Sequence, residues 1–177
     1  MSENDPIRFA IVGAGMVAEY HQRAITANED QGARLEAIVH YDPDRFDAIA
    51  EEFGVRCIDH ETMLADESID AVAICTPSGQ HPEQAIAAAR AGKHVLVEKP
   101  MAVSLDDADR MIEVCEEAGV RLGVVYQRRA EPLFRKIRRA IDGGDFGELT
   151  LANVTMPYFR GQPYYDQAAW RGTWDLD

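Results

Sequence analysis

The chain has 177 residues, 46% hydrophobic and 28% charged, which is typical of a globular protein with room for one full domain and part of a second. Its formal net charge of −13 disfavours nucleic acids and anionic membranes as partners, because both would be repelled. No apolar run approaches the length of a transmembrane helix, and the acidic start MSENDPIRF lacks an apolar signal segment, so we expect a cytoplasmic protein.

The chain opens with an apolar run, IRFAIV, that leads into Gly13-Ala14-Gly15 and then into an amphipathic stretch. This order predicts a strand, a tight glycine turn and a helix over 17–27. In a dinucleotide-binding unit the first glycine permits the turn, the second lets a pyrophosphate approach the backbone, and a third small residue lets the helix pack closely. Gly13, Gly15 and Ala18 suit these roles, and the phosphates would lie at the positive helix end near Met16 and Val17.

Strands and helices then alternate. Strands are expected over 34–40, 55–58, 71–74, 94–97 and 121–125, and helices over 43–53, 61–65, 80–91 and 105–118. Asp42 before Pro43 forms the expected pair of helix cap and first helical residue. Strands that are continuously apolar and alternate with helices predict an α/β fold, a doubly wound parallel sheet of the Rossmann type.

The character of the chain changes near Tyr126. The arginine-rich stretch 127–139 predicts a helix that ends at Asp142-Gly143-Gly144, and alternation over 148–158 predicts an antiparallel strand. We therefore expect a dinucleotide-binding domain over 1–125. Residues 126–177 would be the start of an incomplete α+β domain for substrate binding or oligomerisation.

The three cysteines, Cys57, Cys75 and Cys115, are odd in number, widely spaced and set in apolar stretches. This usage is typical of buried thiols in a reducing compartment. The sequence shows neither a zinc-binding pattern nor a disulfide framework, so no metal site is expected.

Three clusters follow predicted strands, where an open parallel sheet places its ligands: residues 13–18, residues 75–81 and Glu98-Lys99-Pro100. The stretch ICTPSGQHPEQAIAAARAGKHVLVEKPMA resembles the signature of the Gfo/Idh/MocA family, which includes glucose-fructose oxidoreductase and inositol dehydrogenase. The Glu-Lys-Pro tripeptide is the most specific mark of that family. YQRR at 126–129 and YYDQAAWRGTWDLD at 164–177 extend the resemblance over nearly the whole chain.

The resemblance implies an enzyme that transfers hydride between NAD or NADP and a secondary alcohol of a sugar, an inositol or a sugar nucleotide. It implies that Lys99 is the active-site lysine and that Glu98 helps to shape the nicotinamide ribose site. An ammonium group in a closed site can hydrogen-bond a substrate hydroxyl and stabilise the oxygen as hydride leaves carbon. The alternative is a surface lysine held by the geometry of Pro100, which is most simply a rigid turn.

The resemblance also implies further ligand contacts. Residues that would line the cofactor groove are Thr76, Pro77, His81 and Gln127. Residues that would contact the substrate are Arg128, Trp170 and Arg171. Each also has a simpler interpretation, since a histidine before a helix can be a plain loop residue and tail aromatics can be core packing. The arginines and lysine from 129 to 139 are expected on a solvated helix face.

The end of the second predicted strand departs from the family pattern. Relatives that use NAD usually carry an acid there, which accepts hydrogen bonds from the adenosine ribose hydroxyls. This sequence has His40, and Asp42 two residues later is either a helix cap or a ribose ligand. His40 or Arg45 could instead contact a 2′-phosphate, so the sequence leaves NAD and NADP both open.

Two further expectations come from the resemblance. Some relatives with this fold are ligand sensors without turnover, such as the galactose-pathway corepressor of yeasts, although an intact Glu98-Lys99-Pro100 weighs against that alternative. Relatives continue into a helix with an aspartate and a histidine that complete the catalytic group. We therefore expect the 177 residues alone to bind cofactor without catalysis, and the longer protein to form a homo-oligomer.

Overall fold

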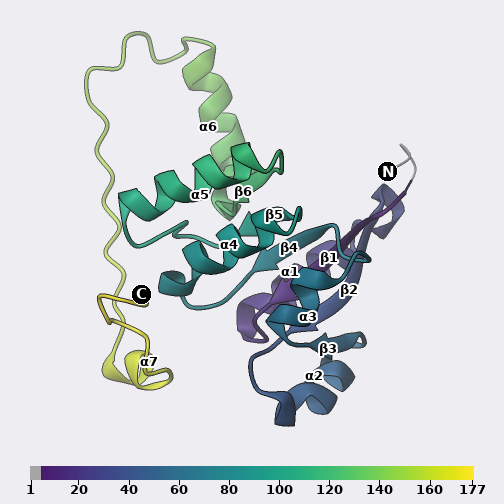
Figure 1. Ribbon diagram of the computed structural model, residues 1–177. Helices are drawn as coiled ribbons and strands as arrows, with labels where there is room; N and C mark the ends of the chain where they lie inside the picture. The colour runs from purple at the N-terminus through teal and green to yellow at the C-terminus, as the bar shows by residue number, and fades with distance from the viewer. Residues whose placement is uncertain (1–4) are drawn as a thin grey trace. The chain divides into compact units, whose positions relative to one another are not determined.

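The computed structural model describes residues 5–177 and has a six-stranded parallel sheet at its centre (Figure 1). The strands are β1 Ile7–Val12, β2 Ala33–Val39, β3 Arg56–Ile58, β4 Ala71–Ile74, β5 His94–Val97 and β6 Leu122–Val124. Their spatial order is β3-β2-β1-β4-β5-β6, and every neighbouring pair is parallel. The strand order reverses between β1 and β4, and sheets of this class bind ligands outside the carboxyl ends of the strands at such a point.

Helices cover both faces of this sheet. They are α1 Met16–Thr26, α2 Phe46–Phe53, α3 His60–Ala65, α4 His81–Arg90 and α5 Leu105–Glu117, with short 3₁₀ helices η1 Glu29–Gln31, η2 Pro43–Arg45 and η3 Ser78–Gln80. One core cluster packs α3, α4 and α5 against Val12, Val39 and Ile74, and the other packs α1 and α2 against Ile11 and Ile38. Because successive strand residues point to opposite faces, the apolar strands feed both clusters. The predicted doubly wound fold is confirmed.

Side-chain caps fix where several helices begin. Asp42 accepts a hydrogen bond from the Asp44 N–H at 3.1 Å, and Pro43 follows it in the first turn of η2. Asp59 accepts from the Thr62 N–H at 2.7 Å at the start of α3. These bonds satisfy N–H groups that have no partner inside the helix. The expected cap at Asp42 is therefore present, although the helix expected over 43–53 forms as η2 followed by α2.

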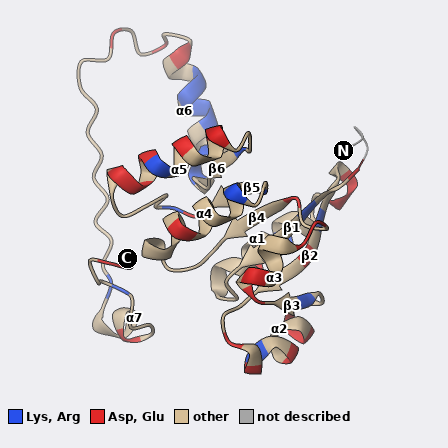
Figure 2. Ribbon diagram, in the orientation of Figure 1, with Lys and Arg blue, Asp and Glu red and all other residues tan. Residues whose placement is uncertain are grey.

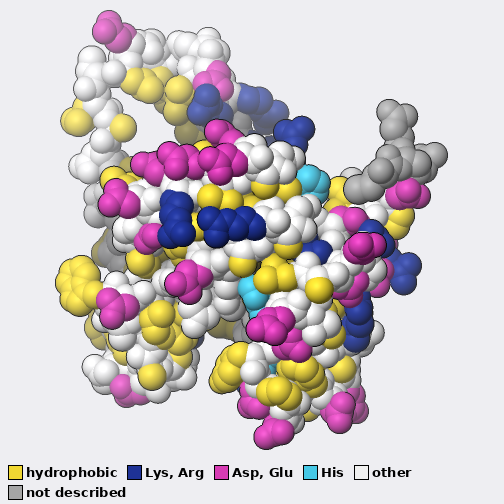
Figure 3. Space-filling model, in the orientation of Figure 1, with side chains coloured by type: hydrophobic (Ala, Val, Ile, Leu, Met, Phe, Trp, Pro, Cys, Tyr) yellow, Lys and Arg dark blue, Asp and Glu magenta, His cyan; other side chains and the backbone are white. Residues whose placement is uncertain are grey.

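Charged side chains are concentrated on particular helices. Acidic residues line the exposed side of α5 (Figures 2 and 3), and basic residues line the helix α6 Pro132–Asp142 (Figure 2). Arg135, Lys136, Arg138 and Arg139 are all exposed, as expected for a solvated helix face. No described helix combines the length and apolar character needed to cross a membrane.

The described chain divides into two compact units. The first runs to Val125 and also includes Thr173–Asp177, and the second is Tyr126–Gly172. The division after Val125 lies where a boundary was expected, but the last five residues group with the first unit rather than with 126–177. Gly79 N–H donates to the Leu176 carbonyl at 3.3 Å, which attaches this tail to the loop after β4.

The second unit contains η4 Gln127–Ala130, α6 and α7 Gln162–Asp166. The antiparallel strand expected over 148–158 is not formed, because residues 149–161 have no regular secondary structure in the described chain. Leu151 and Val154 in this stretch are 84% and 78% exposed. A strand needs a neighbour to satisfy its backbone groups, and no described strand pairs here. The alternation of apolar and polar residues was therefore not sufficient to predict a strand over 148–158.

Candidate active site

Gly13 makes the turn between β1 and α1. Its φ of +102° lies in a region that L side chains rarely adopt, and a Cβ atom there would lie 3.0 Å from the Cys75 carbonyl oxygen. Its N–H donates to the Val39 carbonyl at 2.9 Å. The turn therefore lies between the ends of β2 and β4, and position 13 requires glycine for both conformation and space.

Gly15 leaves space open at the start of α1. It is the N-cap residue with φ −92°, no described side chain caps the helix, and nothing lies within 4 Å of a Cβ built there. Ala18 is fully buried in the cluster beneath the helix. The free space lies beside the positive end of the helix dipole, so the residues present fit the pyrophosphate of a dinucleotide.

The loop after β4 brings Thr76, Pro77 and His81 to the same edge of the sheet. Thr76 and Pro77 are partly exposed, and the Thr76 hydroxyl donates to Gln84 Oε1 at 2.6 Å. His81 is only 1% exposed, with Nδ1 2.9 Å from the Pro100 carbonyl and Nε2 2.9 Å from the Thr76 carbonyl. Both ring nitrogens of His81 therefore face backbone carbonyls of the protein, and the expectation that His81 lines the cofactor groove stays a prediction.

Glu98, Lys99 and Pro100 follow β5, the strand next to β4. The peptide bond between Lys99 and Pro100 is cis, and the Lys99 side chain is exposed. Glu98 Oε1 lies 3.0 Å from His21 Nε2, and Glu98 Oε2 accepts the Lys99 N–H at 3.2 Å. Burial raises the pKa of Glu98, but the hydrogen bonds from His21 and the Lys99 N–H together with nearby positive charge outweigh it, so this pKa lies below its ordinary value. Glu98 is thus a carboxylate at neutral pH.

His21 carries no motif in the sequence that marks it as a site residue. It lies on the buried face of α1 with Ala18 and Ile25, and it is 8% exposed. The available signal was a polar residue three positions after one core residue and four before another, which is the spacing of a single helix face. Such a residue needs a buried hydrogen-bond partner, and here that partner is Glu98.

His40 lies at the end of β2 and is 8% exposed. Its Nδ1 lies 3.1 Å from the Asp42 nitrogen and 3.4 Å from the Asp42 carbonyl oxygen. Arg45 Nη1 lies 3.4 Å from Nε2 of the same ring. With Asp42 engaged as a helix cap, an imidazole and a guanidinium lie together at the position where NAD-binding relatives have an acid.

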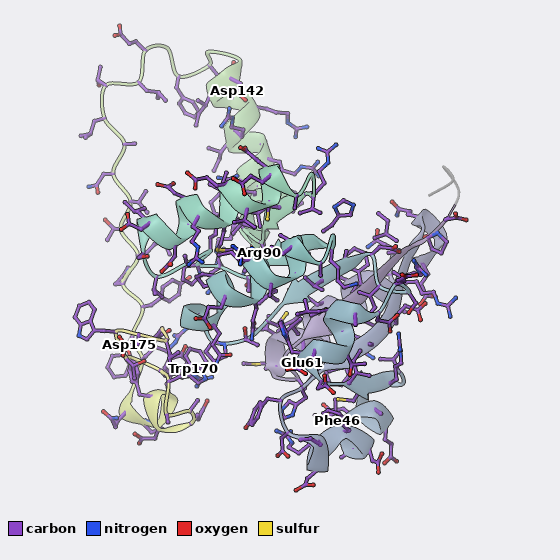
Figure 4. All side chains as sticks on the ribbon, in the orientation of Figure 1. Phe46, Glu61, Arg90, Asp142, Trp170 and Asp175 are labelled. Carbon is purple, nitrogen blue, oxygen red and sulfur yellow. The ribbon has the colours of Figure 1, made fainter. Side chains whose placement is uncertain are left out.

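The remaining site residues lie in the second unit. Gln127 and Arg128 are exposed in η4, and Arg128 Nη2 donates to the Tyr158 hydroxyl at 3.4 Å. Trp170 follows α7 (Figure 4), and the Arg171 guanidinium lies 5.6 Å from its ring. Arg171 Nη1 also donates to the Tyr164 carbonyl at 2.7 Å. The structure thus pairs Arg128 and Arg171 with aromatic side chains of their own unit.

The sheet is parallel and its strand order reverses between β1 and β4. An open glycine turn follows β1, and Lys99 follows β5 on the other side of β4. These features define a dinucleotide-binding protein of the doubly wound class. The sequence profile of GFO_IDH_MocA, the oxidoreductase family with an NAD-binding Rossmann fold, matches residues 7–126. The chain therefore belongs to this family, which confirms the resemblance.

Known proteins of this family match the chain over part of their own length. Inositol 2-dehydrogenase of Rhizobium meliloti (strain 1021) is 37% identical over 151 residues, which are 84% of this chain and 44% of that protein. The crystal structure of the WlbA dehydrogenase from Bordetella pertussis in complex with NADH and UDP-GlcNAcA is similar with a TM-score of 0.90 and 41% identity, covering 97% of this chain and 53% of that one. Scyllo-inositol dehydrogenase from Lactobacillus casei, with bound NAD(H) and scyllo-inositol, has a TM-score of 0.73 and 30% identity, covering 82% and 44%.

Proposed function

We propose that the protein to which this chain belongs is an NAD(P)-dependent oxidoreductase that transfers hydride between the nicotinamide and a secondary alcohol of a carbohydrate. The observation that carries the proposal is the placement of the open turn at Gly15 and the exposed Lys99 at the carboxyl ends of β1 and β5, on either side of β4. The nicotinamide supplies the hydride chemistry when bound. The chain supplies binding, orientation and charge.

Lys99 is the group that would act on the substrate. Its side chain is exposed directly after β5, and its backbone N–H is held by Glu98. An ammonium placed there donates a hydrogen bond to a substrate hydroxyl and stabilises negative charge on the oxygen during hydride transfer. The Glu98 carboxylate beside it is in the right ionisation state to accept hydrogen bonds from a ribose.

A nucleotide-activated sugar acid is the substrate class that we favour. The WlbA dehydrogenase structure bound to UDP-GlcNAcA aligns with 97% of this chain, whereas the scyllo-inositol dehydrogenase structure aligns with 82%. An alignment over 97% of this chain must include most of the second unit, Tyr126–Gly172. Within that unit the guanidinium of Arg171 lies 4.4 Å from the Tyr164 ring centroid. Such a combination of cation and aromatic surface suits an anionic sugar nucleotide better than a neutral polyol.

Substitution of Lys99 tests the proposed function. In the whole protein, Lys99→Ala is expected to lower kcat with UDP-GlcNAcA by roughly a hundredfold or more, because it removes a positioned proton-transfer group. The dissociation constants of NAD(H) and NADP(H) should change far less. Lys136→Ala, which removes an exposed lysine on α6, is the matched control and should leave kcat unchanged.

The same measurements distinguish the alternatives. Near-normal turnover by Lys99→Ala would reduce this lysine to a structural role. Tight binding of cofactor and sugar nucleotide with no turnover by the unsubstituted protein would instead favour a sensor. Turnover of myo-inositol but not of UDP-GlcNAcA would overturn the substrate class and leave the reaction type intact.

Two properties of the whole protein also stay proposals. We propose a cytoplasmic, reducing location, which the free thiols of Cys57, Cys75 and Cys115 support. We also propose a homo-oligomer, supported by the exposed apolar side chains of the second unit such as Leu151 and Phe159. Light scattering on the purified whole protein measures the second property directly.

A further inference from the structure

We propose that His21 is a positioning residue, which orients the Glu98 carboxylate and through it the backbone of Lys99. The inference rests on the proposed function insofar as Lys99 acts on the substrate. Its structural part, the attachment of the Lys99 backbone to helix α1, can be tested without turnover.

The hydrogen bond between His21 and Glu98 joins distant parts of the chain. The two residues are 77 positions apart, and His21 Nε2 lies 3.0 Å from Glu98 Oε1. Their side chains are only 9% and 16% exposed, so water competes little for the hydrogen bond between them. An imidazole on the core face of a helix is costly unless it is hydrogen-bonded, and this bond provides the compensation.

The two oxygens of Glu98 face different partners. Oε1 lies next to the ring of His21, and Oε2 accepts the backbone N–H of Lys99 at 3.2 Å. If the first partner is removed, the carboxylate loses one of its two fixed contacts and can rotate away from the second. The orientation of the Lys99 backbone therefore depends on a side chain of α1.

His81 holds the same turn from the other side. Its Nδ1 lies 2.9 Å from the Pro100 carbonyl and its Nε2 2.9 Å from the Thr76 carbonyl. The backbone that carries Lys99 is thus attached to α1 through Glu98 and to the loop after β4 through His81. A single broken attachment should displace Lys99 without unfolding the sheet.

The location of His21 on α1 gives this attachment a functional consequence. Helix α1 begins at the open turn of Gly15, where the cofactor phosphates would bind. The same helix therefore fixes both the phosphates and, through His21, the lysine. Small misplacements of reacting groups cost large factors in rate, so the loss of this attachment should appear in kcat rather than in binding.

The test uses His21→Phe, which keeps a ring of similar size and removes the hydrogen-bonding nitrogen. In the whole protein we expect kcat to fall on the order of tenfold to a hundredfold, with KM and cofactor affinity nearly unchanged. His21→Gln retains an N–H donor and should restore part of the rate. His60→Phe, the same substitution on α3, is the matched control and should leave kcat unchanged.

A double substitution separates positioning from general damage. If His21 acts through Lys99, then His21→Phe should have no further effect on the residual rate of Lys99→Ala. An equal loss in both backgrounds would overturn the proposal. A large effect of Lys99→Ala with a normal rate for His21→Phe would overturn this inference alone, whereas a normal rate for Lys99→Ala would overturn the proposed function as well.

Hydrogen exchange tests the structural part without turnover. The Lys99 amide, which donates to Glu98, should exchange at least tenfold faster in His21→Phe than in the unsubstituted protein, while amides in β4 should be unaffected. An unchanged rate at Lys99 would overturn the proposal. If His21→Phe does not fold, His21→Leu, which also removes the ring nitrogen and leaves Glu98 in place, is expected to give the same acceleration.

Discussion

Two glycines at the end of β1 have different physical requirements. Gly13 is fixed by its backbone conformation, with φ +102°, whereas Gly15 has φ −92°, which any residue can adopt. Only the space beside Gly15 is unusual, because nothing lies within 4 Å of a Cβ built there. A side chain at position 15 should therefore affect a ligand and leave the fold intact.

Gly15→Val is expected to abolish dinucleotide binding while changing the thermal unfolding midpoint little, because the valine occupies the path of the pyrophosphate. Calorimetric titration with NADH and NADPH measures the first effect and circular dichroism the second. Gly161→Val is the matched control, since position 161 also has a negative φ, −71°. Tight binding by a folded Gly15→Val protein would refute the assignment of the phosphate site.

His40 is the residue that bears on cofactor choice. We expect His40→Asp to shift the ratio of affinities toward NAD(H), because a carboxylate accepts hydrogen bonds from ribose hydroxyls and repels a 2′-phosphate. The measurement is the ratio of the NADH and NADPH dissociation constants. If this ratio does not move, position 40 does not lie at the adenosine ribose.

Motifs at the ends of strands could be predicted from the sequence, because the glycine turn and Glu98-Lys99-Pro100 are recognisable by residue type and spacing. The roles of His21 and His81 could not. Their partners are 77 and 19 positions away, and only the folded sheet brings them within 3.0 Å. A histidine in a sequence does not reveal which atoms its ring nitrogens will face.

At the scale of elements, strands with a partner were predictable and the one without a partner was not. Ala71–Ile74 and His94–Val97 form as expected, because both are buried between neighbours of the same sheet. Residues 149–161 alternate like a strand but have no regular structure, because no described strand supplies the hydrogen bonds. The alternation of apolar residues along a segment indicates which face of a strand would be buried. It does not show whether a second strand is present to pair with it.

Asp66 links the end of α3 to β3 and to the loop before β4. Its carboxylate accepts the Ser68 N–H at 2.8 Å and pairs with Arg56 on β3 at 2.6 Å. The hydrogen bonds from Ser68, and then the pairing with Arg56, lower the pKa of Asp66 from 3.8 to about 2 despite partial burial. The folded protein therefore favours the ionised carboxylate, and this stabilisation is lost as the pH falls from about 4 through about 2.

Asp66→Asn should reduce the acid sensitivity of folding. The free energy of unfolding of the unsubstituted protein is expected to fall more between pH 4 and pH 2 than that of the variant, by up to about 1 kcal/mol after allowance for solvent screening. Urea unfolding at a series of pH values measures the difference. Glu67→Gln, at an exposed neighbouring acid, is the control, and parallel profiles for Asp66→Asn and the unsubstituted protein would contradict the linkage.

At the scale of the molecule, the two units differ in how much they bury. The first contains both core clusters, including Ile11, Ile38 and Ile74, which are 0% exposed. No described residue of Tyr126–Gly172 is fully buried, and Leu133 and Phe134 on α6 are 63% and 40% exposed. Since local stability follows buried apolar contact and protected hydrogen bonds, the units should open at very different free energies.

Hydrogen exchange and limited proteolysis of the 177-residue chain measure this difference. Amides of β1, β4 and β5 should exchange slowest, and trypsin and chymotrypsin should cut first within 149–161, because that stretch combines exposed side chains with no regular backbone pairing. Addition of the preferred cofactor should slow exchange at 13–18 and 75–81, which flank the phosphate site, and leave 149–161 unchanged. Uniform protection across both units, or cofactor protection confined to 149–161, would show that the stable core and the cofactor site lie elsewhere than the sheet and its carboxyl edge.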